Sequence, residues 1–324
     1  MKKKARFEPV SHLCCPSCHN PLESGGVGIR CRGCGREYAR GEDGFISFLV
    51  SEDHDPQHAQ QESYIDRQKT YPIRVYRDFL RPLLSAEPVQ AALEVGCGLG
   101  TETEQARKDG YDAYGIDLPN MGAFWQKAGR APSHFFKCSA VRLPFRDGVF
   151  DFVWSLGVVE HIGTTSDTAT LAPDYAEARR AYADELVRVT RPGGRIVVSC
   201  PNKSFPIDIQ HGPTCGTRFK KLRWHIYNRT KLNLHKTWGR YHLLSYGEAG
   251  RLFRGNPAVA GMEALPLRHY FGFNKFRSGY LTTVRALVTG YVEHLPRVLL
   301  PTFLNPYMLV MIRTRTAVRD QDGP

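Results

Sequence analysis

Glycines alternate with other residues over 93–100 (LEVGCGLG), directly after a short apolar run. The pattern is E-x-G-x-G-x-G, formed by Glu94, Gly96, Gly98 and Gly100. Glycines at this density permit a sharp turn and let a ligand lie close against the backbone. A dinucleotide fingerprint would need a glycine at position 101, where the chain has a threonine. The acid before the first glycine instead suits a cofactor with a cationic amino-acid group and no pyrophosphate.

A second acid, Asp117, follows about twenty residues later, at the end of another apolar run. At the carboxyl edge of a sheet, such an acid can accept hydrogen bonds from two ribose hydroxyls. We expect 91–95 and 114–117 to be buried strands of an open α/β sheet, with a helix over 101–108 between them. These elements place the glycines and Asp117 at one cofactor-binding corner.

Two later segments extend the predicted sheet. A Leu-Pro-Phe loop at 143–145 leads into a buried strand over 150–155, in which Asp151 is expected to be structural. Over 191–198 (RPGGRIVV) a helix ends, a Pro-Gly-Gly turn reverses the chain, and a β-branched strand begins.

The C-terminal third supplies the remaining elements. Ser245 and Glu248 form a capping box that begins a helix, expected to run through Leu252. The last two strands are expected over 262–267 and 307–312. A helix predicted within 276–300 has one broad apolar face, formed by Leu281, Val284, Leu287, Val288, Val292 and Leu295. This face indicates core or dimer packing, and its flanking arginines leave a peripheral membrane contact as the alternative.

The four segments from 91 to 198 resemble, in order and spacing, the Rossmann-like S-adenosylmethionine-dependent methyltransferases. The resemblance covers about residues 60–315 and is strongest over 91–200. It implies an α/β fold, a doubly wound seven-stranded methyltransferase sheet, with S-adenosyl-L-methionine as cofactor. It also implies that Glu94 and the three glycines surround the methionine part. Asp117 would hold the ribose hydroxyls, and Leu118 and Met121 would lie near the adenine.

One departure from the family pattern concerns the adenine. Similar enzymes often have Gly-Asp-Ala before the Leu-Pro-Phe loop, and the acid receives the adenine amino group. Here the stretch is Cys138-Ser139-Ala140, so Ser139 takes the place of the acid, beside Ala140. A hydroxyl accepts such a hydrogen bond more weakly than a carboxylate does.

Five of the nine cysteines lie within residues 14–34. Two C-x-x-C pairs, Cys15 with Cys18 and Cys31 with Cys34, have the spacing of a four-thiolate zinc site. Two disulfides are the alternative, and the absence of a secretory signal pattern argues against them. Cys14 could replace Cys15 as the first ligand. The segment resembles the small zinc-ribbon modules found beside some bacterial methyltransferases, which implies a structural Zn²⁺.

The net charge of +12 is concentrated in the C-terminal part of the chain. Residues 1–208 carry 26 Lys and Arg against 27 Asp and Glu, whereas 209–316 carry 17 against three. The stretch 209–247 has no acid, and its basic residues are interleaved with aromatic ones. Because it follows the predicted strand that ends near Pro201, we expect a basic lid over an anionic acceptor. A solvated basic face is the plainer interpretation.

Three residues are candidates for activating an acceptor. His161 follows the predicted strand over 150–155, and Asp208 and His211 lie in the stretch 201–213 (PNKSFPIDIQHGP). That stretch resembles one found in bacterial methyltransferases of cell-surface glycan and small-molecule pathways. We therefore expect methyl transfer to a hydroxyl of a small-molecule or glycan intermediate. The alternatives are an RNA methyltransferase that holds its strand with 209–247 and the ribbon, and a non-catalytic binding module.

The predicted organisation has four parts. Residues 1–50 form the zinc-ribbon module, 51–90 a linker with leading helices, 91–316 the methyltransferase domain with a lid insertion over 203–247, and 317–324 a tail. Prolines interrupt the apolar region near the C-terminus, so no run approaches a membrane span. A cytoplasmic enzyme is expected, and the sequence does not set its oligomeric state.

Overall fold

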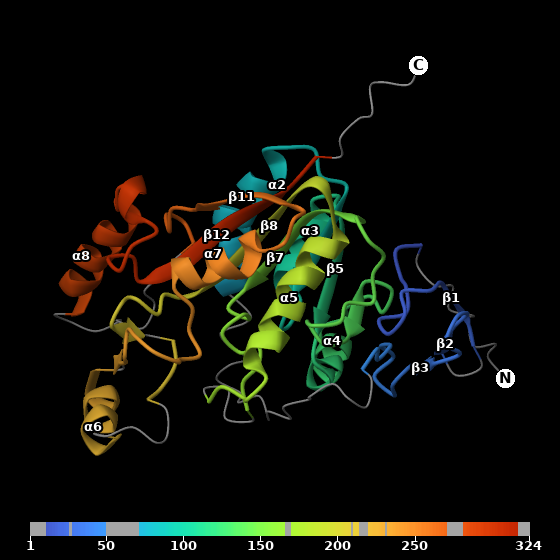
Figure 1. Cartoon of the computed structure of the whole chain (residues 1–324), viewed down its shortest axis with the longest axis horizontal. Coiled ribbons are helices and arrows are strands. Elements are labelled where there is room, and N and C mark those ends of the chain that lie inside the picture. Colours follow the sequence, from blue (N-terminus) through green and yellow to red (C-terminus); the bar gives the residue numbers. More distant parts are fainter. Residues whose placement is uncertain are drawn as a thin grey trace.

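The structure is a computed structural model, and it describes residues 11–25, 28–49, 71–165, 170–208, 210–213, 220–230, 232–270 and 281–316. A seven-stranded sheet covered by helices lies at the centre, and a small three-stranded sheet lies at one end of the long axis (Figure 1). Helices α6 (Lys220–Thr230) and α8 (Leu281–Glu293) lie at the other end.

The central sheet has the order β11-β12-β8-β7-β4-β5-β6. Its strands are β4 (Ala91–Val95), β5 (Asp112–Asp117), β6 (Phe135–Lys137), β7 (Phe150–Leu156), β8 (Thr190–Pro201), β11 (Val259–Ala264) and β12 (Tyr307–Thr314). Strands β4 to β8 pair in parallel, and β12 is antiparallel to both of its neighbours. The predicted doubly wound, seven-stranded methyltransferase sheet is thus confirmed. The chain order reverses between β4 and β7, and ligands of such sheets bind at that point.

Helices cover both faces of this sheet. The remaining described helices are η1 (Tyr76–Leu80), α2 (Arg81–Ser85), α3 (Thr101–Lys108), η2 (Pro119–Met121), α4 (Gly122–Lys127), α5 (Tyr175–Val189), α7 (Tyr246–Arg254) and η3 (Arg297–Leu299). Strands β9 (Ile207–Asp208) and β10 (Asn233–Leu234) form a separate two-stranded sheet. Because side chains alternate along a strand, Leu93 packs in the core shared with α5 and α7. Its neighbour Ala92 packs in the core shared with η1, α2 and α3. Figure 1 shows α5 and α7 in front of the sheet and α2 and α3 behind it.

Several local predictions are confirmed and others need correction. The capping box of α7 is present, with Ser245 Oγ accepting from Glu248 N, and the helix extends to Arg254. Strand β11 ends at Ala264 instead of 267, because Pro266 has no N–H to continue the ladder. The predicted Pro-Gly-Gly turn is absorbed into β8, which begins at Thr190.

The apolar face predicted within 276–300 is only partly a core face. Side chains of Val292 and Leu295 are buried, whereas Leu287 is 70% exposed. Leu281 and Val284 fall where the structure describes no side chains. Among the described residues, no helix is long and apolar enough to cross a membrane.

The N-terminal module is attached to the edge of the central sheet. Its strands β1 (Leu22–Ser24), β2 (Gly28–Cys31) and β3 (Glu37–Ala39) form an antiparallel sheet. The chain then runs beside β6, where Phe48 N donates to Lys137 O (2.7 Å) and Lys137 N donates to Ile46 O (3.0 Å). The rings of Phe48 and Phe136 pack edge to face. The module therefore covers the β6 edge and shares the core of the central domain.

Candidate active site and metal centre

The glycine turn follows β4 and requires glycine at its ends. Gly96, Gly98 and Gly100 have φ of 79°, 52° and 65°, in the left-handed region that favours glycine. A Cβ at Gly96 would overlap with Val158, and one at Gly100 would overlap with the ring of Phe135. The backbone is thus left bare at the start of α3, where it can approach a ligand closely.

Asp117 closes this corner from the end of β5. Its Oδ2 accepts a hydrogen bond from Gly98 N (2.6 Å), and its Oδ1 accepts one from Leu118 N (2.7 Å). Burial raises the pKa of Asp117 to about 6, so the carboxylate is charged at neutral pH. Each oxygen can accept a further hydrogen bond, which fits the two hydroxyls of a ribose.

Glu94 has a structural contact that the sequence did not indicate. Its Oε2 accepts from Thr103 N (3.0 Å) and from the Thr103 hydroxyl (2.5 Å), so it joins β4 to the first turn of α3. Burial raises the pKa of Glu94 to about 7. Its predicted position beside the methionine part of the cofactor stays a prediction.

The residues expected near the adenine gather around Asp117. Leu118 follows it directly, and Met121 is buried where η2 meets α4. Strand β6 brings Ser139 and Ala140 to the same corner, since Cys138 N donates to Asp117 O (3.0 Å). The Ser139 hydroxyl accepts from Val141 N (3.4 Å) in its own turn. This geometry agrees with the predicted adenine side, whose contacts remain predictions.

The three candidate acceptor residues come together beyond β7 and β8. His211 Nδ1 lies 2.8 Å from Asp208 Oδ2, and the ring centroids of His211 and His161 are 5.2 Å apart. The structure adds two residues that the sequence analysis did not propose as catalytic. Glu160 is fully buried beside His161, and the ring of His242 packs against that of His211 at 5.1 Å. We call Glu160, His161, Asp208, His211 and His242 the acceptor cluster.

Ionisation in the acceptor cluster follows from burial and proximity. Burial alone would raise the pKa of Asp208, but the neighbouring His211 and two backbone N–H donors hold that pKa below its usual value. Burial raises the pKa of Glu160 to about 7. Burial, together with the charge of His211, lowers the pKa of His242 to about 3, so this imidazole is neutral. No sequence signal marks His242, because it lies in a loop 34 residues after Asp208.

The four predicted cysteines converge in the N-terminal module. Their sulfur atoms lie within 4.8 Å of one another, with Cys15 and Cys34 at 3.7 Å and Cys18 and Cys31 at 3.4 Å. Tetrahedral zinc with Zn–S bonds near 2.3 Å places sulfurs roughly 3.8 Å apart, whereas a disulfide needs about 2.05 Å. Gly33 N and Cys34 N donate to Cys31 Sγ, as expected around a thiolate. The residues present therefore fit a zinc ion.

Cys14 lies outside this group. Its backbone N donates to Pro144 O (3.0 Å) in the central domain, and its side chain is buried there. The geometry favours Cys15 as the first ligand, because its sulfur belongs to the four-cysteine group.

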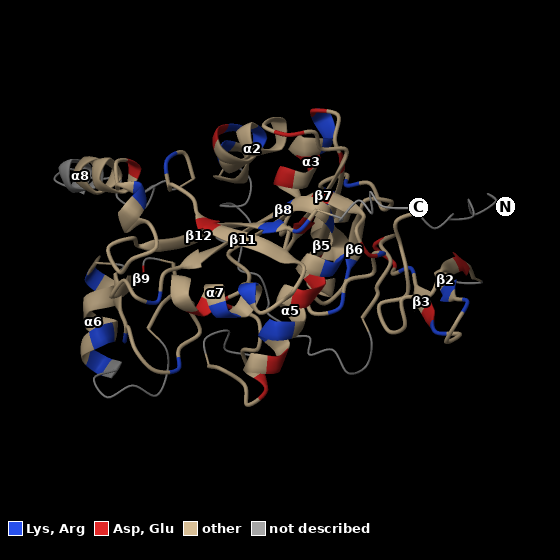
Figure 2. Cartoon of the chain, turned by 45° about the horizontal axis from the view of Figure 1, so that its top comes forward, with Lys and Arg blue, Asp and Glu red and all other residues tan. Residues whose placement is uncertain are grey.

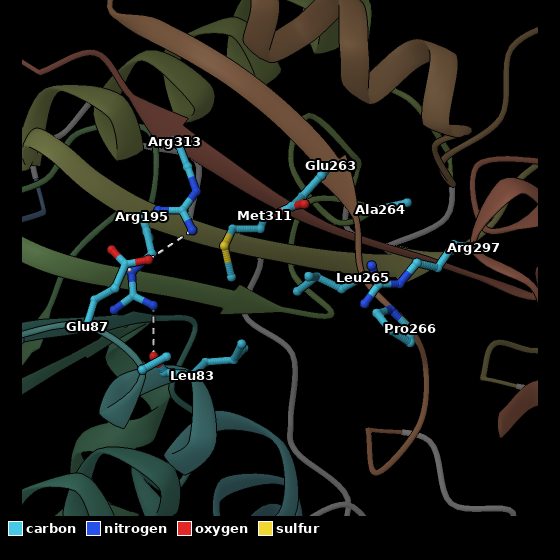
Figure 3. A pocket seen from close by; sticks show the side chains of 11 residues that line it. Leu83, Glu87, Arg195, Glu263, Ala264, Leu265, Pro266, Arg297, Met311 and Arg313 are labelled. Atoms are coloured by element: carbon cyan, nitrogen blue, oxygen red, sulfur yellow. Dashed lines mark hydrogen bonds and ion pairs between the residues drawn. The ribbon is translucent and has the colours of Figure 1, made fainter. Parts of the chain in front are cut away.

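A pocket lies near the amino ends of the parallel strands, on the other side of the sheet from the glycine turn and the acceptor cluster, which lie at the carboxyl ends (Figure 3). Glu87 bonds there with Arg313 (2.9 Å) and pairs with Arg195 (3.5 Å), while Arg195 Nη1 donates to Leu83 O (2.8 Å). These charges pair with one another across the pocket, which joins the segment before β4 to β8 and β12.

Comparison with known proteins gives a family for the centre of the chain: residues 93–198 match the family described as the methyltransferase domain. The matched residues include the glycine turn, Asp117, Glu160 and His161. The match ends within β8, so Asp208, His211 and His242 lie beyond it.

Curated proteins that are similar to part of this chain carry methyltransferase names. Chloroplastic tocopherol O-methyltransferase of Arabidopsis thaliana is 34% identical over 117 residues, 34% of this chain and 30% of that protein. Demethylmenaquinone methyltransferase of Beutenbergia cavernae is 31% identical over 126 residues, 39% of this chain and 47% of that protein. The chain thus spans less than half the length of these relatives.

Solved methyltransferase structures are also similar. Phosphoethanolamine N-methyltransferase 2 of Haemonchus contortus, in complex with S-adenosyl-L-methionine, is 15% identical with a TM-score of 0.43, covering 83% of this chain and 60% of that one. Geranyl diphosphate C-methyltransferase of Streptomyces coelicolor is 15% identical with a TM-score of 0.41, covering 81% and 85%.

Proposed function

We propose that the protein transfers a methyl group from S-adenosylmethionine to a hydroxyl of a small-molecule or glycan intermediate. One contact carries the proposal. Val158, on the loop after β7, packs so closely on Gly96 that a Cβ there would overlap with it. Glu160 and His161 follow Val158 by two and three residues. The acceptor cluster is therefore built against the turn that would bind the cofactor.

The cofactor would lie across the carboxyl ends of β4, β5 and β6. Glu94, Gly96, Gly98 and Gly100 would surround its methionine part, Asp117 its ribose, and Leu118, Met121, Ser139 and Ala140 its adenine. When bound, it supplies a methyl group made electrophilic by the sulfonium. The chain contributes alignment of nucleophile and methyl, which is worth on the order of 7–11 kcal/mol in well-oriented reactions.

The acceptor cluster favours a hydroxyl as the methylated group. A hydroxyl must lose its proton as it attacks, and a positioned base contributes roughly 10²–10⁴-fold. The acceptor cluster supplies histidines and carboxylates that would assist the departure of this proton. The relatives alone do not decide the atom, because their names include an O-methyltransferase of tocopherol and an N-methyltransferase of norajmaline.

A small acceptor suits the burial of this cluster. Glu160, Asp208 and His242 are all fully buried. The curated relatives also carry the names of small molecules, such as tocopherol and demethylmenaquinone. A glycan intermediate remains the second form of this proposal, supported by the resemblance of the stretch 201–213.

The test is transfer of a labelled methyl group from S-adenosylmethionine into fractionated cell extracts. We expect label in the small-molecule or glycan fraction, at an oxygen atom. Label found only in RNA, or at a nitrogen or carbon atom, would overturn the proposal. A Gly96→Val variant, whose side chain would overlap with Val158, provides the inactive control.

We also propose that Cys15, Cys18, Cys31 and Cys34 hold a structural Zn²⁺. The sulfur spacing, too wide for disulfides, supports this assignment. The ion would stabilise a module too small to form its own core.

A peripheral contact with an anionic membrane is proposed as well. Seven of the eight large apolar side chains exposed in the described residues follow position 208: Leu222, Leu234, Trp238, Leu287, Tyr291, Val298 and Phe303. The excess of Lys and Arg lies in the same part of the chain, and α6 carries basic but no acidic residues (Figure 2). Exposed apolar groups among cations suit an anionic lipid surface. Flotation with anionic but not neutral vesicles, weakened by Trp238→Ser with Leu287→Ser, is expected.

A further inference from the structure

Three residues of the acceptor cluster have the composition and spacing of a metal site. Glu160, His161 and His211 each place one ligand atom within 4.8 Å of the others. They come from two segments, the loop after β7 and the chain after β9 (Ile207–Asp208). Two imidazoles and one carboxylate on one side of an ion leave its other positions open, as in catalytic metal sites.

Glu160 gives an independent reason for a cation here. It is fully buried, and neither of its carboxylate oxygens has a hydrogen-bond partner among the described residues. An ionised carboxylate buried in this way is costly unless a positive charge or hydrogen bonds compensate it. The group facing it is a pair of histidines, which are ligands as well as bases.

Asp208 orients His211 for such a site. Asp208 Oδ2 lies 2.8 Å from His211 Nδ1, and Asp208 Oδ1 accepts from Gln210 N (2.8 Å) and His211 N (3.2 Å). With Nδ1 bonded to this carboxylate, Nε2 is the ring atom that would coordinate. Metal-binding histidines almost always have such a carboxylate or carbonyl behind them.

An alternative triad, Asp208, His211 and His242, satisfies the same distance criterion. It is weaker, because Asp208 Oδ2 and His211 Nδ1 already bond to each other. His242 instead packs its ring on that of His211, outside the first triad.

We propose that Glu160, His161 and His211 bind a divalent transition metal ion that coordinates the acceptor hydroxyl. The donor set suits Zn²⁺, Mn²⁺, Fe²⁺ or Co²⁺ better than Mg²⁺, which prefers oxygen ligands alone. The role in catalysis rests on the proposed methyl transfer, whereas the binding of the ion does not.

The chemistry follows from the charge of the ion. Coordination lowers the pKa of a bound hydroxyl, so its proton leaves to solvent and a metal-bound oxyanion remains. This oxygen forms the new O–CH₃ bond while the S–CH₃ bond breaks, and that electron pair stays on sulfur. S-adenosylhomocysteine and the methyl ether are the products.

Cobalt distinguishes the proposed site from the cysteine site. Protein stripped of metal and reloaded with Co²⁺ is expected to bind two ions per chain, of which one gives thiolate-to-cobalt charge-transfer absorption. In a Cys31→Ser, Cys34→Ser variant that absorption is lost, and one ion per chain remains. A single ion per chain in the unmodified protein, with thiolate absorption only, would overturn the proposal.

Single substitutions identify the ligands. Glu160→Gln and His161→Gln should each weaken Co²⁺ binding at the second site more than about 100-fold, beyond the 10–100-fold expected for removing the orienting group in Asp208→Asn. His242→Gln, a neighbour outside the triad, should keep the affinity within threefold. S-adenosylmethionine binding in each variant checks that the domain is folded. Unchanged Co²⁺ affinity in folded Glu160→Gln would contradict the assignment.

The two proposals fail in different ways. If Co²⁺ binds at the triad but no oxygen atom is methylated, the proposed function is wrong and the site stands. If methylation of a hydroxyl continues unchanged with no ion at the triad, the metal site is wrong and the proposed function stands.

Discussion

Lys137 Nζ lies 2.8 Å from Asp43 Oδ2, in an ion pair whose side chains are 8% and 17% exposed. Asp43 belongs to the N-terminal module, and Lys137 ends β6, just before the residues expected near the adenine. Asp43 also packs against Gly122, at the start of α4. The module is thus joined to the wall of the predicted cofactor site.

A second contact extends this connection to the glycine turn. The rings of Phe45 and Trp125 pack edge to face at 5.2 Å, and Trp125 Nε1 donates to Gly98 O (2.7 Å). A change in the module can therefore reach the backbone that would bind the methionine part.

The first prediction concerns the buried ion pair. Lys137→Met leaves the Asp43 carboxylate without its partner, and breaking a buried pair costs about 3–5 kcal/mol. Chemical denaturation should show this loss, and calorimetry should show weaker S-adenosylmethionine binding. In the same module, Glu23→Gln breaks an exposed pair with Arg32 and should change stability by about 0–1 kcal/mol. Equal effects of both substitutions would contradict the role assigned to Lys137.

The second prediction concerns Asp117. Asp117→Ala removes the acceptor of Gly98 N and the proposed acceptor of two ribose hydroxyls, and each hydrogen bond to a charged group is worth about 1.5–3 kcal/mol. Calorimetry should show at least a tenfold loss of cofactor affinity. Asp112→Ala, at the exposed start of the same strand, is the matched control and should bind normally. Full affinity in Asp117→Ala would refute the cofactor assignment.

The third prediction is a pH dependence of cofactor affinity. Burial raises the pKa of Asp117 to about 6, so the carboxylate is protonated below that pH. A protonated carboxyl has lost acceptor capacity toward the ribose, so affinity should be constant above pH 7 and fall as the pH drops through 6. Titrations between pH 5 and 8 measure this. In Asp117→Asn the step near pH 6 should disappear, and its persistence would assign the titration to another group.

The fourth prediction concerns the cysteine site. Metal analysis should find zinc bound to the four cysteines, and Cys31→Ser with Cys34→Ser should release it. Because the module shares the core with β6, this loss should also lower the thermal midpoint of the central domain. Cys14→Ala should keep the zinc, since Cys14 lies outside the group. Loss of zinc in that variant would make Cys14 the ligand.

The fifth prediction separates RNA from small acceptors. An RNA held by many Lys and Arg would show affinity falling steeply with salt, and neutralising Lys220, Lys221 and Arg223 would flatten that slope by several units. We expect only weak RNA binding and mildly salt-dependent turnover. Part of the reason is Arg223, whose Nη2 donates to Asn233 Oδ1 (2.8 Å) within the segment itself. Methylation of a defined RNA position at physiological salt would establish the alternative.

The amino-acid sequence was sufficient for features that depend on neighbouring residues. The glycines at 96, 98 and 100 were identifiable because only glycine readily adopts the positive φ of that turn. The capping box of α7 was identifiable because Ser245 and Glu248 bond to each other's backbone across one helical turn. The cysteine pairs were identifiable because zinc knuckles have fixed local spacing. The central sheet was predicted from the order and spacing of local patterns along residues 91–198.

Tertiary structure alone decided what distant segments do together. Asp43 and Lys137 are 94 residues apart, and no local pattern pairs them. His161 and His211 meet only because β7 and β8 are adjacent parallel strands whose carboxyl ends open at the same edge. Glu160 precedes His161 in the sequence, but only the fold shows that its carboxylate is buried with no hydrogen-bond partner for either oxygen among the described residues. Burial and the approach of distant side chains depend on the packing of the whole chain, which local spacing does not encode.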